Sequence, residues 1–156
     1  MKKCFRLVWP ILWLLMIAWQ QWNGEKIEHT ETEWLQILGP QRFKVMRQKG
    51  MEKAFIGLYA YPREEMGIYE CAACHLPLFE SIEQYDAGGG YPCFKRPIAS
   101  KHLYYEEDRT LPLQRYEILC RRCNSHIGHV FHDGPPPKGL RYCAKSLALN
   151  FLSIPK

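Results

Sequence analysis

Two CxxC pairs constrain the fold of this chain more than any other feature of its sequence. Cys71 and Cys74 form the first pair and Cys120 and Cys123 form the second, with 45 residues between them. The spacing within each pair lets both sulfur atoms of a tight turn point at one ion, and two such turns supply a tetrahedral zinc site. Because the intervening segment is longer than in a small zinc ribbon, the sheet of a larger domain must bring the two turns together.

A zinc site of this kind is structural, because four thiolates leave no open coordination position for water. Bound zinc would then contribute folding free energy and hold the sheet together. Two disulfides or a redox-active CxxC are the alternatives, and export of the chain would favour disulfides. A bridge within a CxxC is strained, however, and this strain favours zinc.

The sequence after Gly50 predicts antiparallel β-sheets. Short apolar or aromatic runs alternate there with turns rich in Gly, Pro and Asp, without the long helical patterns of parallel sheets. Upstream, the apolar pattern from Glu33 is helical and is interrupted at Gly39 and Pro40, which predicts two short helices, the second ending at Gly50. The chain therefore belongs to a mainly β class with short N-terminal helices.

The N-terminus has a different character from the rest of the chain. Three basic residues among the first six precede an apolar run of thirteen residues, Leu7 to Trp19. As a helix this run spans about 20 Å, less than the roughly 30 Å hydrocarbon core of a bilayer. We predict a signal-like or membrane-anchor segment over residues 1–24, a linker over 25–35 and a domain over 36–156. The domain would then lie outside the cytoplasm. A cytoplasmic protein, with the apolar segment packed on the domain, is the alternative.

The charge of the chain argues against nucleic-acid binding. The formal net charge is +5, and the three basic residues of the N-terminus account for more than half of it. The rest of the sequence shows no basic helix or stripe of the kind that tracks a phosphate backbone. We therefore expect the protein to bind no nucleic acid. We also expect it to be a monomer.

A second group of reactive side chains follows the second CxxC pair. Three titratable residues, His126, His129 and Asp133, precede the segment LRYCAKS. If this segment is a strand, Arg141, Cys143 and Lys145 share one face, and two cations beside a thiol lower its pKa. A small buried hydrophobe is the alternative for a lone cysteine. The local enrichment in histidine favours a reactive thiol.

Together, these motifs resemble the B-type peptide methionine sulfoxide reductases, which reduce the R epimer of methionine sulfoxide. The resemblance runs from about Gln36 to Phe151 and rests on FKVMRQKGMEKAF, GIYECAACHLPLFES, YDAGGGYPCF, ILCRRCNSHIGHVFHDGP and GLRYCAKSLALNF, in that order. It implies a fold of two antiparallel sheets in a tent-like arrangement, with short N-terminal helices. It also implies that the four CxxC cysteines hold a structural zinc ion.

The resemblance implies a role for each residue that matches a family motif. The implied catalytic residues are Cys143, His126, His129, Asp133 and Arg141. Cys143 would attack the sulfoxide sulfur and become a sulfenic acid, while a histidine protonates the oxygen. Tyr91 and Phe131 are candidates for an apolar wall around the substrate methyl group. We also expect the Tyr91 hydroxyl to be able to bond the sulfoxide oxygen.

The chain departs from the family pattern at several positions. Tyr91 replaces the usual tryptophan, Cys93 a serine, Lys145 an asparagine and His75 a glycine. Gly89 stands where some members carry a resolving cysteine, so either an external thiol or another cysteine must clear the sulfenic acid. Cys93 is the candidate for this resolving role. The alternative is that Cys93 merely fills the space of the serine.

We therefore predict thiol-dependent reduction of peptide methionine-R-sulfoxide. The expected substrates are oxidised proteins or peptides, and the expected partner is a thioredoxin-like reductant. One alternative is a non-catalytic, zinc-dependent binding module, in which Cys143 would be dispensable. A second is a thiol–disulfide oxidoreductase that uses one CxxC pair and holds no zinc.

Overall fold

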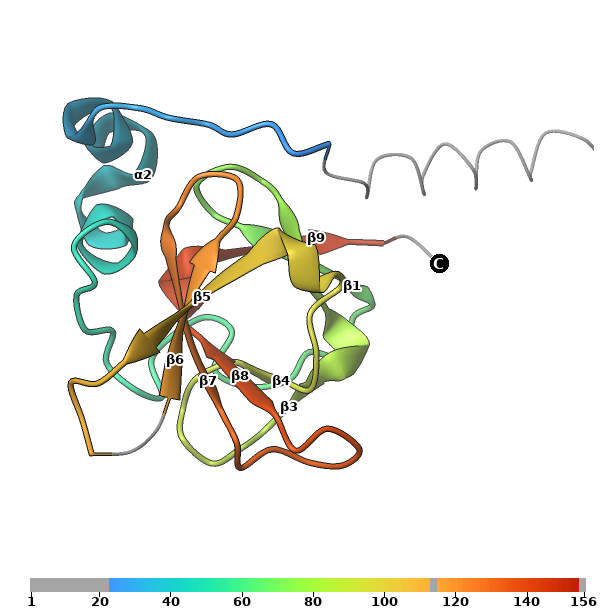
Figure 1. Ribbon diagram of the computed structural model, residues 1–156. Coiled ribbons are helices and arrows are strands. Elements are labelled where there is room, and N and C mark those ends of the chain that lie inside the picture. Colours follow the sequence, from blue (N-terminus) through green and yellow to red (C-terminus); the bar gives the residue numbers. More distant parts are fainter. Residues whose placement is uncertain (1–22, 113–114, 155–156) are drawn as a thin grey trace, which may run out of the picture.

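The computed structural model describes residues 23–112 and 115–154, and in these residues the chain is mainly β (Figure 1). The strands are β1 (Gly67–Cys71), β2 (Pro77–Glu80), β3 (Gln84–Tyr85), β4 (Cys93–Phe94), β5 (Leu103–Asp108), β6 (Arg115–Cys120), β7 (His126–Phe131), β8 (Arg141–Ala144) and β9 (Leu149–Ser153). Short 3-10 helices are η1 (Ser81–Glu83), η2 (Ser100–His102) and η3 (Ser146–Ala148).

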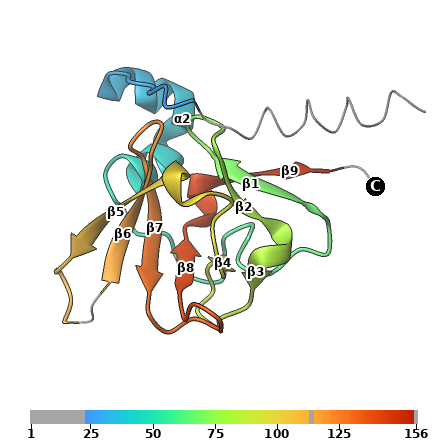
Figure 2. The same cartoon turned by 45° about the vertical axis from the view of Figure 1, so that its right-hand side comes forward.

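The strands form two antiparallel sheets, which confirms the predicted fold class. The smaller sheet has the order β2-β1-β9, and the larger sheet has the order β3-β4-β8-β7-β6-β5. Figure 2 shows β5 to β8 side by side, with α2 (Glu31–Met46) at the upper left. Residues 1–22 of the predicted signal-like or anchor segment lie outside the described residues. Within the described ranges, no helix is both long and apolar enough to cross a bilayer.

Helix α2 contains the two predicted short helices, joined at a break. Gly39 has φ 69° and ψ 166°, outside the helical region, and Pro40 begins the second part. The helix begins at Glu31, within the predicted linker, because Thr30 and Glu33 form a capping box: each side chain accepts a hydrogen bond from the other residue's backbone N–H.

The second part of α2 ends at Met46 rather than at the predicted Gly50. Lys49 adopts a left-handed φ of 54°, and the Gly50 amide closes the turn on the Lys44 carbonyl at 2.8 Å. The helix therefore stops one turn before the glycine that marked its predicted end.

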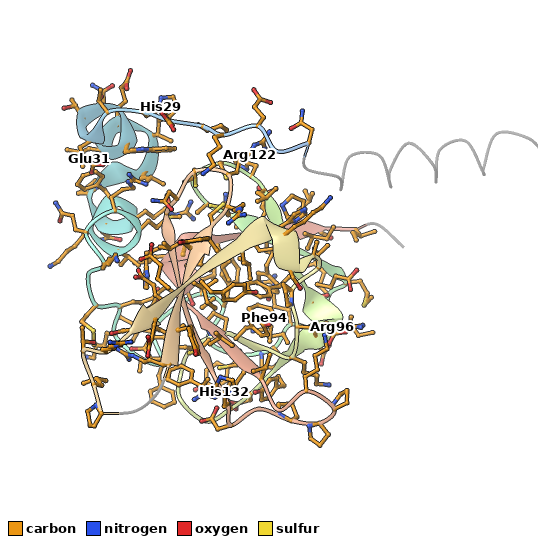
Figure 3. The ribbon with its side chains drawn as sticks, in the orientation of Figure 1. His29, Glu31, Phe94, Arg96, Arg122 and His132 are labelled. Carbon is orange, nitrogen blue, oxygen red and sulfur yellow. The ribbon has the colours of Figure 1, made fainter. Side chains whose placement is uncertain are left out.

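Aromatic side chains fill the space between the two sheets. The rings of Phe79 on β2 and Phe94 on β4 stack with centroids 4.2 Å apart, and Tyr69 on β1 meets Phe94 edge-on at 5.1 Å. All three side chains are fully buried. Figure 3 shows Phe94 in the interior of the molecule. This contact fixes the smaller sheet against the strands that carry the site described below.

The register of the larger sheet places Cys143 at its centre. On β8, Cys143 pairs with Cys93 of β4 on one side and with His129 of β7 on the other. Gly128 lies directly beside this point, and a Cβ atom added there would lie 2.0 Å from the Cys143 carbonyl oxygen. The two strands therefore approach each other as closely as they do only because residue 128 has no side chain.

We expect Gly128→Ala to destabilise the protein by about 1–3 kcal/mol, because the added methyl group forces β7 away from β8. Gly89→Ala is the matched control, since a Cβ atom added at Gly89 meets no other atom within 4 Å. Chemical denaturation of both variants measures the difference. Equal free energies of unfolding for Gly128→Ala and the wild type would contradict the proposed close approach.

Candidate active site and metal centre

Two matching turns, one from each sheet, hold the four CxxC cysteines. Cys71 ends β1 and Cys120 ends β6. In each turn the amide four residues later donates to the carbonyl of the first cysteine at 2.8 Å, from His75 to Cys71 and from Asn124 to Cys120. His75 and Asn124 have φ values of 59° and 58°, in the left-handed region that glycine adopts most readily. This geometry accounts for the glycine that the family usually has at position 75.

The four sulfur atoms form one compact group. The Sγ atoms of Cys71 and Cys123 lie 3.7 Å apart, those of Cys74 and Cys120 lie 3.5 Å apart, and all four lie within 4.8 Å of one another. A tetrahedron with Zn–S bonds of about 2.3 Å has edges of about 3.8 Å. The cysteines are buried and unbridged. The prediction that these four residues can hold one metal ion is therefore confirmed.

Cys143 lies between a second thiol and a histidine. It is partly exposed, whereas Cys93, directly opposite on β4, is only 1% exposed. The backbone N–H of Ala144 donates to the Pro92 carbonyl at 2.9 Å, so Cys93 and Cys143 form a non-hydrogen-bonded pair. The side chains of such pairs approach each other most closely, with Cα atoms about 4.5 Å apart.

Arg141 connects three of the predicted site residues. Its guanidinium donates to both carboxylate oxygens of Asp133, at 2.9 Å and 2.8 Å, and lies 4.3 Å from the centre of the Phe131 ring. Another guanidinium nitrogen lies 4.0 Å from the Sγ atom of Cys93. Asp133 is itself exposed, so its structural effect is to orient Arg141. Arg141 in turn directs its positive charge at Cys93.

The two thiols shift each other's pKa in opposite directions. Interaction with the Cys143 thiol, together with the Arg141 guanidinium, lowers the pKa of Cys93 to about 7. The same pairing, followed by burial, raises the pKa of Cys143, and this effect exceeds the opposing one of Arg141 and Lys145. The expectation that flanking cations would give Cys143 a low pKa was therefore wrong. The nearer cross-strand thiol dominates, and Cys93 is the more readily ionised of the two.

Each of the two predicted histidines is hydrogen-bonded to a carboxylate. Nδ1 of His126 lies 2.7 Å from Glu117, and Nε2 of His129 lies 2.8 Å from Asp108. Burial lowers the pKa of both histidines, and the carboxylates only partly offset it. Both rings are therefore neutral in the resting protein at neutral pH. The two rings lie edge-on to each other with centroids 5.4 Å apart.

The sequence did not identify Glu117 and Asp108 as site residues. Glu117 is buried, and it accepts a second hydrogen bond from Lys49 at 2.7 Å. Asp108 also forms an ion pair with Arg115 at 2.8 Å. In the sequence, both acids look like polar residues on the solvent side of a strand. The two acids come within hydrogen-bonding distance of the histidines only because β5, β6 and β7 are neighbours in the sheet.

The hydroxyl of Tyr91 is already bonded within the protein, and its ring contacts a lysine. The hydroxyl donates to the Glu52 carbonyl oxygen at 2.7 Å, which differs from the expectation that it would bond the sulfoxide. The Lys145 ammonium lies 4.2 Å from the centre of the Tyr91 ring. The strand β8 ends at Ala144, so Lys145 follows the strand instead of continuing its alternation. Its positive charge still acts on Cys143.

The fold and the site define a thiol-dependent oxidoreductase built on a metal-binding β scaffold. Only a redox or nucleophilic role accounts for a partly exposed thiol beside a second thiol of low pKa, with histidines and an arginine around them.

Comparison with known proteins defines the family. The SelR domain matches residues 38–153. The peptide methionine sulfoxide reductase MsrB of Chromohalobacter salexigens is 46% identical over 129 residues, which cover 82% of this chain and 96% of that protein. The enzyme of the same name from Methanosarcina barkeri is 45% identical over 125 residues, covering 80% and 87%. The chain therefore belongs to the B-type peptide methionine sulfoxide reductase family.

We expect the purified protein to hold one zinc ion per chain, and Cys71→Ser and Cys120→Ser to lose both the zinc and the folded structure. Each substitution removes a ligand from a different sheet, so either one breaks the connection between the sheets. Cys93→Ser is the control, since it also replaces a buried cysteine but should retain the zinc. Elemental analysis and circular dichroism measure the two properties. A folded wild-type protein without metal would refute the zinc assignment.

Proposed function

We propose that this protein reduces methionine-R-sulfoxide in peptides and proteins to methionine, with Cys143 as the nucleophile. One observation carries this assignment: of the two paired thiols, Cys143 is partly exposed and Cys93 is buried. Although Cys93 is the more readily ionised thiol, only Cys143 of the pair is open to a substrate. Membership of the family supports the reaction, since its relatives are named as peptide methionine sulfoxide reductases.

In the proposed first step, the Cys93 thiolate acts as the base for its neighbour. As Cys93 takes the proton of Cys143, the Cys143 sulfur attacks the sulfoxide sulfur. The sulfur–oxygen bond of the substrate breaks, and the oxygen remains on Cys143 as a sulfenic acid. The sulfur of the substrate is reduced by two electrons and leaves as methionine, and the sulfur of Cys143 is oxidised by two electrons.

The sulfoxide oxygen must be protonated during this attack, and His126 and His129 are the proposed donors. Both are neutral at rest, so one must take up a proton before it can act as an acid. The carboxylates of Glu117 and Asp108 stabilise the imidazolium that forms, and their hydrogen bonds fix the ring orientation. Asp133 and Arg141 contribute by placing a positive charge beside the thiol pair.

The substrate side chain is proposed to lie against Tyr91 and Phe131. Both rings border the sheet face that carries Cys143, and each already stacks with a cation, Lys145 or Arg141. An aromatic face accommodates the methyl group of methionine sulfoxide. The hydroxyl of Tyr91 remains bonded to the Glu52 carbonyl and takes no part in this contact.

The sulfenic acid is proposed to be cleared by Cys93. Its thiol attacks the Cys143 sulfur, a disulfide forms, and the sulfenic oxygen leaves as water. The spacing of about 4.5 Å between Cα atoms of a non-hydrogen-bonded pair lies within the range that disulfides bridge. An external dithiol of the thioredoxin type would then reduce the bridge. A zinc ion held by Cys71, Cys74, Cys120 and Cys123 would stabilise the two sheets and would take no part in these steps.

We expect Cys143→Ser to lower the rate of reduction on the order of a thousandfold or more, because a hydroxyl is a much weaker nucleophile than a thiolate. Fold and zinc content should not change. The assay uses the separate R and S epimers of N-acetylmethionine sulfoxide with dithiothreitol, and only the R epimer should react with the wild type. Residual activity within tenfold of the wild type would remove Cys143 from its role.

Oxidation of the wild type with one equivalent of substrate, without reductant, should produce a Cys93–Cys143 disulfide that peptide mass spectrometry detects. In Cys93→Ser, which lacks the proposed base, the sulfenic acid should form more slowly but should then persist and react with dimedone, because no second thiol is in reach. Turnover of this variant with a thioredoxin should also slow. If the wild type accumulates sulfenic acid and Cys93→Ser recycles normally, Cys93 only fills the space of a serine.

A further inference from the structure

The loop that joins α2 to β1 exposes a row of large apolar side chains. Their exposed fractions are 83% for Met51, 56% for Phe55, 70% for Ile56, 75% for Leu58 and 55% for Tyr61. Single exposed apolar residues are ordinary on a protein surface, but several on one short loop indicate a binding surface. Residues 51–58, called the apolar loop below, carry four of the five.

The apolar loop is held firmly in place. The Phe55 amide donates to the Gly90 carbonyl at 2.9 Å, and the Tyr59 amide donates to the Ser146 hydroxyl at 3.3 Å. Gly57 packs so closely that an added Cβ atom would lie 2.2 Å from the Ser146 hydroxyl oxygen. The apolar side chains therefore point outward from a fixed backbone.

Glu52 ties the apolar loop to both sides of the active site. Its buried carboxylate accepts hydrogen bonds from the amides of Ser146 and Leu147, at 2.7 Å and 2.9 Å, in the turn that follows Cys143. Its carbonyl accepts the hydroxyl of Tyr91. The apolar loop is thus anchored beside Tyr91, which is part of the proposed binding site for the sulfoxide side chain.

A groove of about 420 Å³ runs between the apolar loop and the second half of α2. Met51, Ile56, Leu58 and Leu147 contribute apolar lining, and Arg42, Lys44 and Lys53 give its rim three positive charges. Glu52 is the only acid among the lining residues, and its carboxylate is already bonded inside the protein. The groove therefore suits an apolar segment with acidic rather than basic neighbours.

We propose that the apolar loop and this groove bind the polypeptide chain next to the oxidised methionine, and that they select extended, apolar segments with acidic neighbours. The inference rests on the proposed function, because it needs a methionine sulfoxide anchored at Cys143. Each extended residue advances about 3.3 Å, so the residues two to four positions away reach about 7–13 Å along the surface. A free amino acid cannot make this contact.

The test compares Ile56→Asp with Ile82→Asp. Both replace an exposed isoleucine, 70% and 64% exposed, but Ile82 lies on η1 outside the groove. The substrates are N-acetylmethionine-R-sulfoxide and two short peptides with a central methionine-R-sulfoxide, flanked either by leucine and valine or by serine and glutamine. Steady-state kinetics with the full chain and dithiothreitol give KM and kcat for each pair.

For the leucine-flanked peptide, Ile56→Asp should raise KM about five- to tenfold, because a buried apolar contact is replaced by a charge. Its kcat should not change, and neither should its kinetics with the serine-flanked peptide or N-acetylmethionine sulfoxide. Ile82→Asp should match the wild type throughout. Adding lysine to the flanks of the leucine peptide should raise the wild-type KM further, and adding glutamate should lower it.

Two results would overturn the proposal. One is an equal KM of wild type and Ile56→Asp for the leucine-flanked peptide. The other is that Ile56→Asp changes only the binding of the full chain to vesicles of anionic phospholipid, which would assign the loop to a membrane surface. A wild type that fails to reduce N-acetylmethionine-R-sulfoxide would instead refute the proposed function, so the two failures are distinguishable.

Discussion

The connection of the two sheets through four cysteines is the constraint on which the rest of this structure depends. Cys71 ends the central strand of a three-stranded sheet, and Cys120 ends a strand of the six-stranded sheet. A sheet must bury its apolar face against another element, and here the three-stranded sheet packs against the larger one. The second cysteine turn also sets the start of β7, since His126 follows Cys123 by three residues. The position of both histidines therefore depends on the metal centre.

The sequence predicted the parts of the fold that depend on local chemistry. CxxC spacing identified the cysteine cluster, and short apolar runs between turns identified antiparallel sheets. Strand alternation accounts for Arg141 and Cys143 on β8, but the strand ends at Ala144, before Lys145. The helix boundaries differed because the pattern of apolar residues does not register a cap: Thr30 and Glu33 start the helix before its first apolar residue.

The candidate site was predictable only where function lies in the residue type. The cysteine, histidine and arginine residues were predicted as site residues from their chemistry. Glu117 and Asp108 were not, because acids on strands are usually solvated. The pKa of Cys143 depends on the same distinction. Side chains two residues apart on a strand lie about 7 Å from each other, while a directly opposed pair lies within about 4.5–5.5 Å. Cys93 therefore outweighs Arg141 and Lys145, and only the register reveals it.

The separation of charge from exposure explains how one thiol pair can serve both halves of the proposed cycle. The thiolate is the reactive form of cysteine, yet of the two thiols it is the buried Cys93 that has the lowered pKa. The open sulfur of Cys143 is protonated and therefore less reactive toward solution oxidants. When Cys93 takes that proton, Cys143 becomes the nucleophile, and Cys93 becomes the thiol that condenses with the sulfenic acid. A serine at position 93 would provide neither the base nor the second sulfur. In the proposed cycle, Cys93 would take the resolving role that the glycine at position 89 cannot provide.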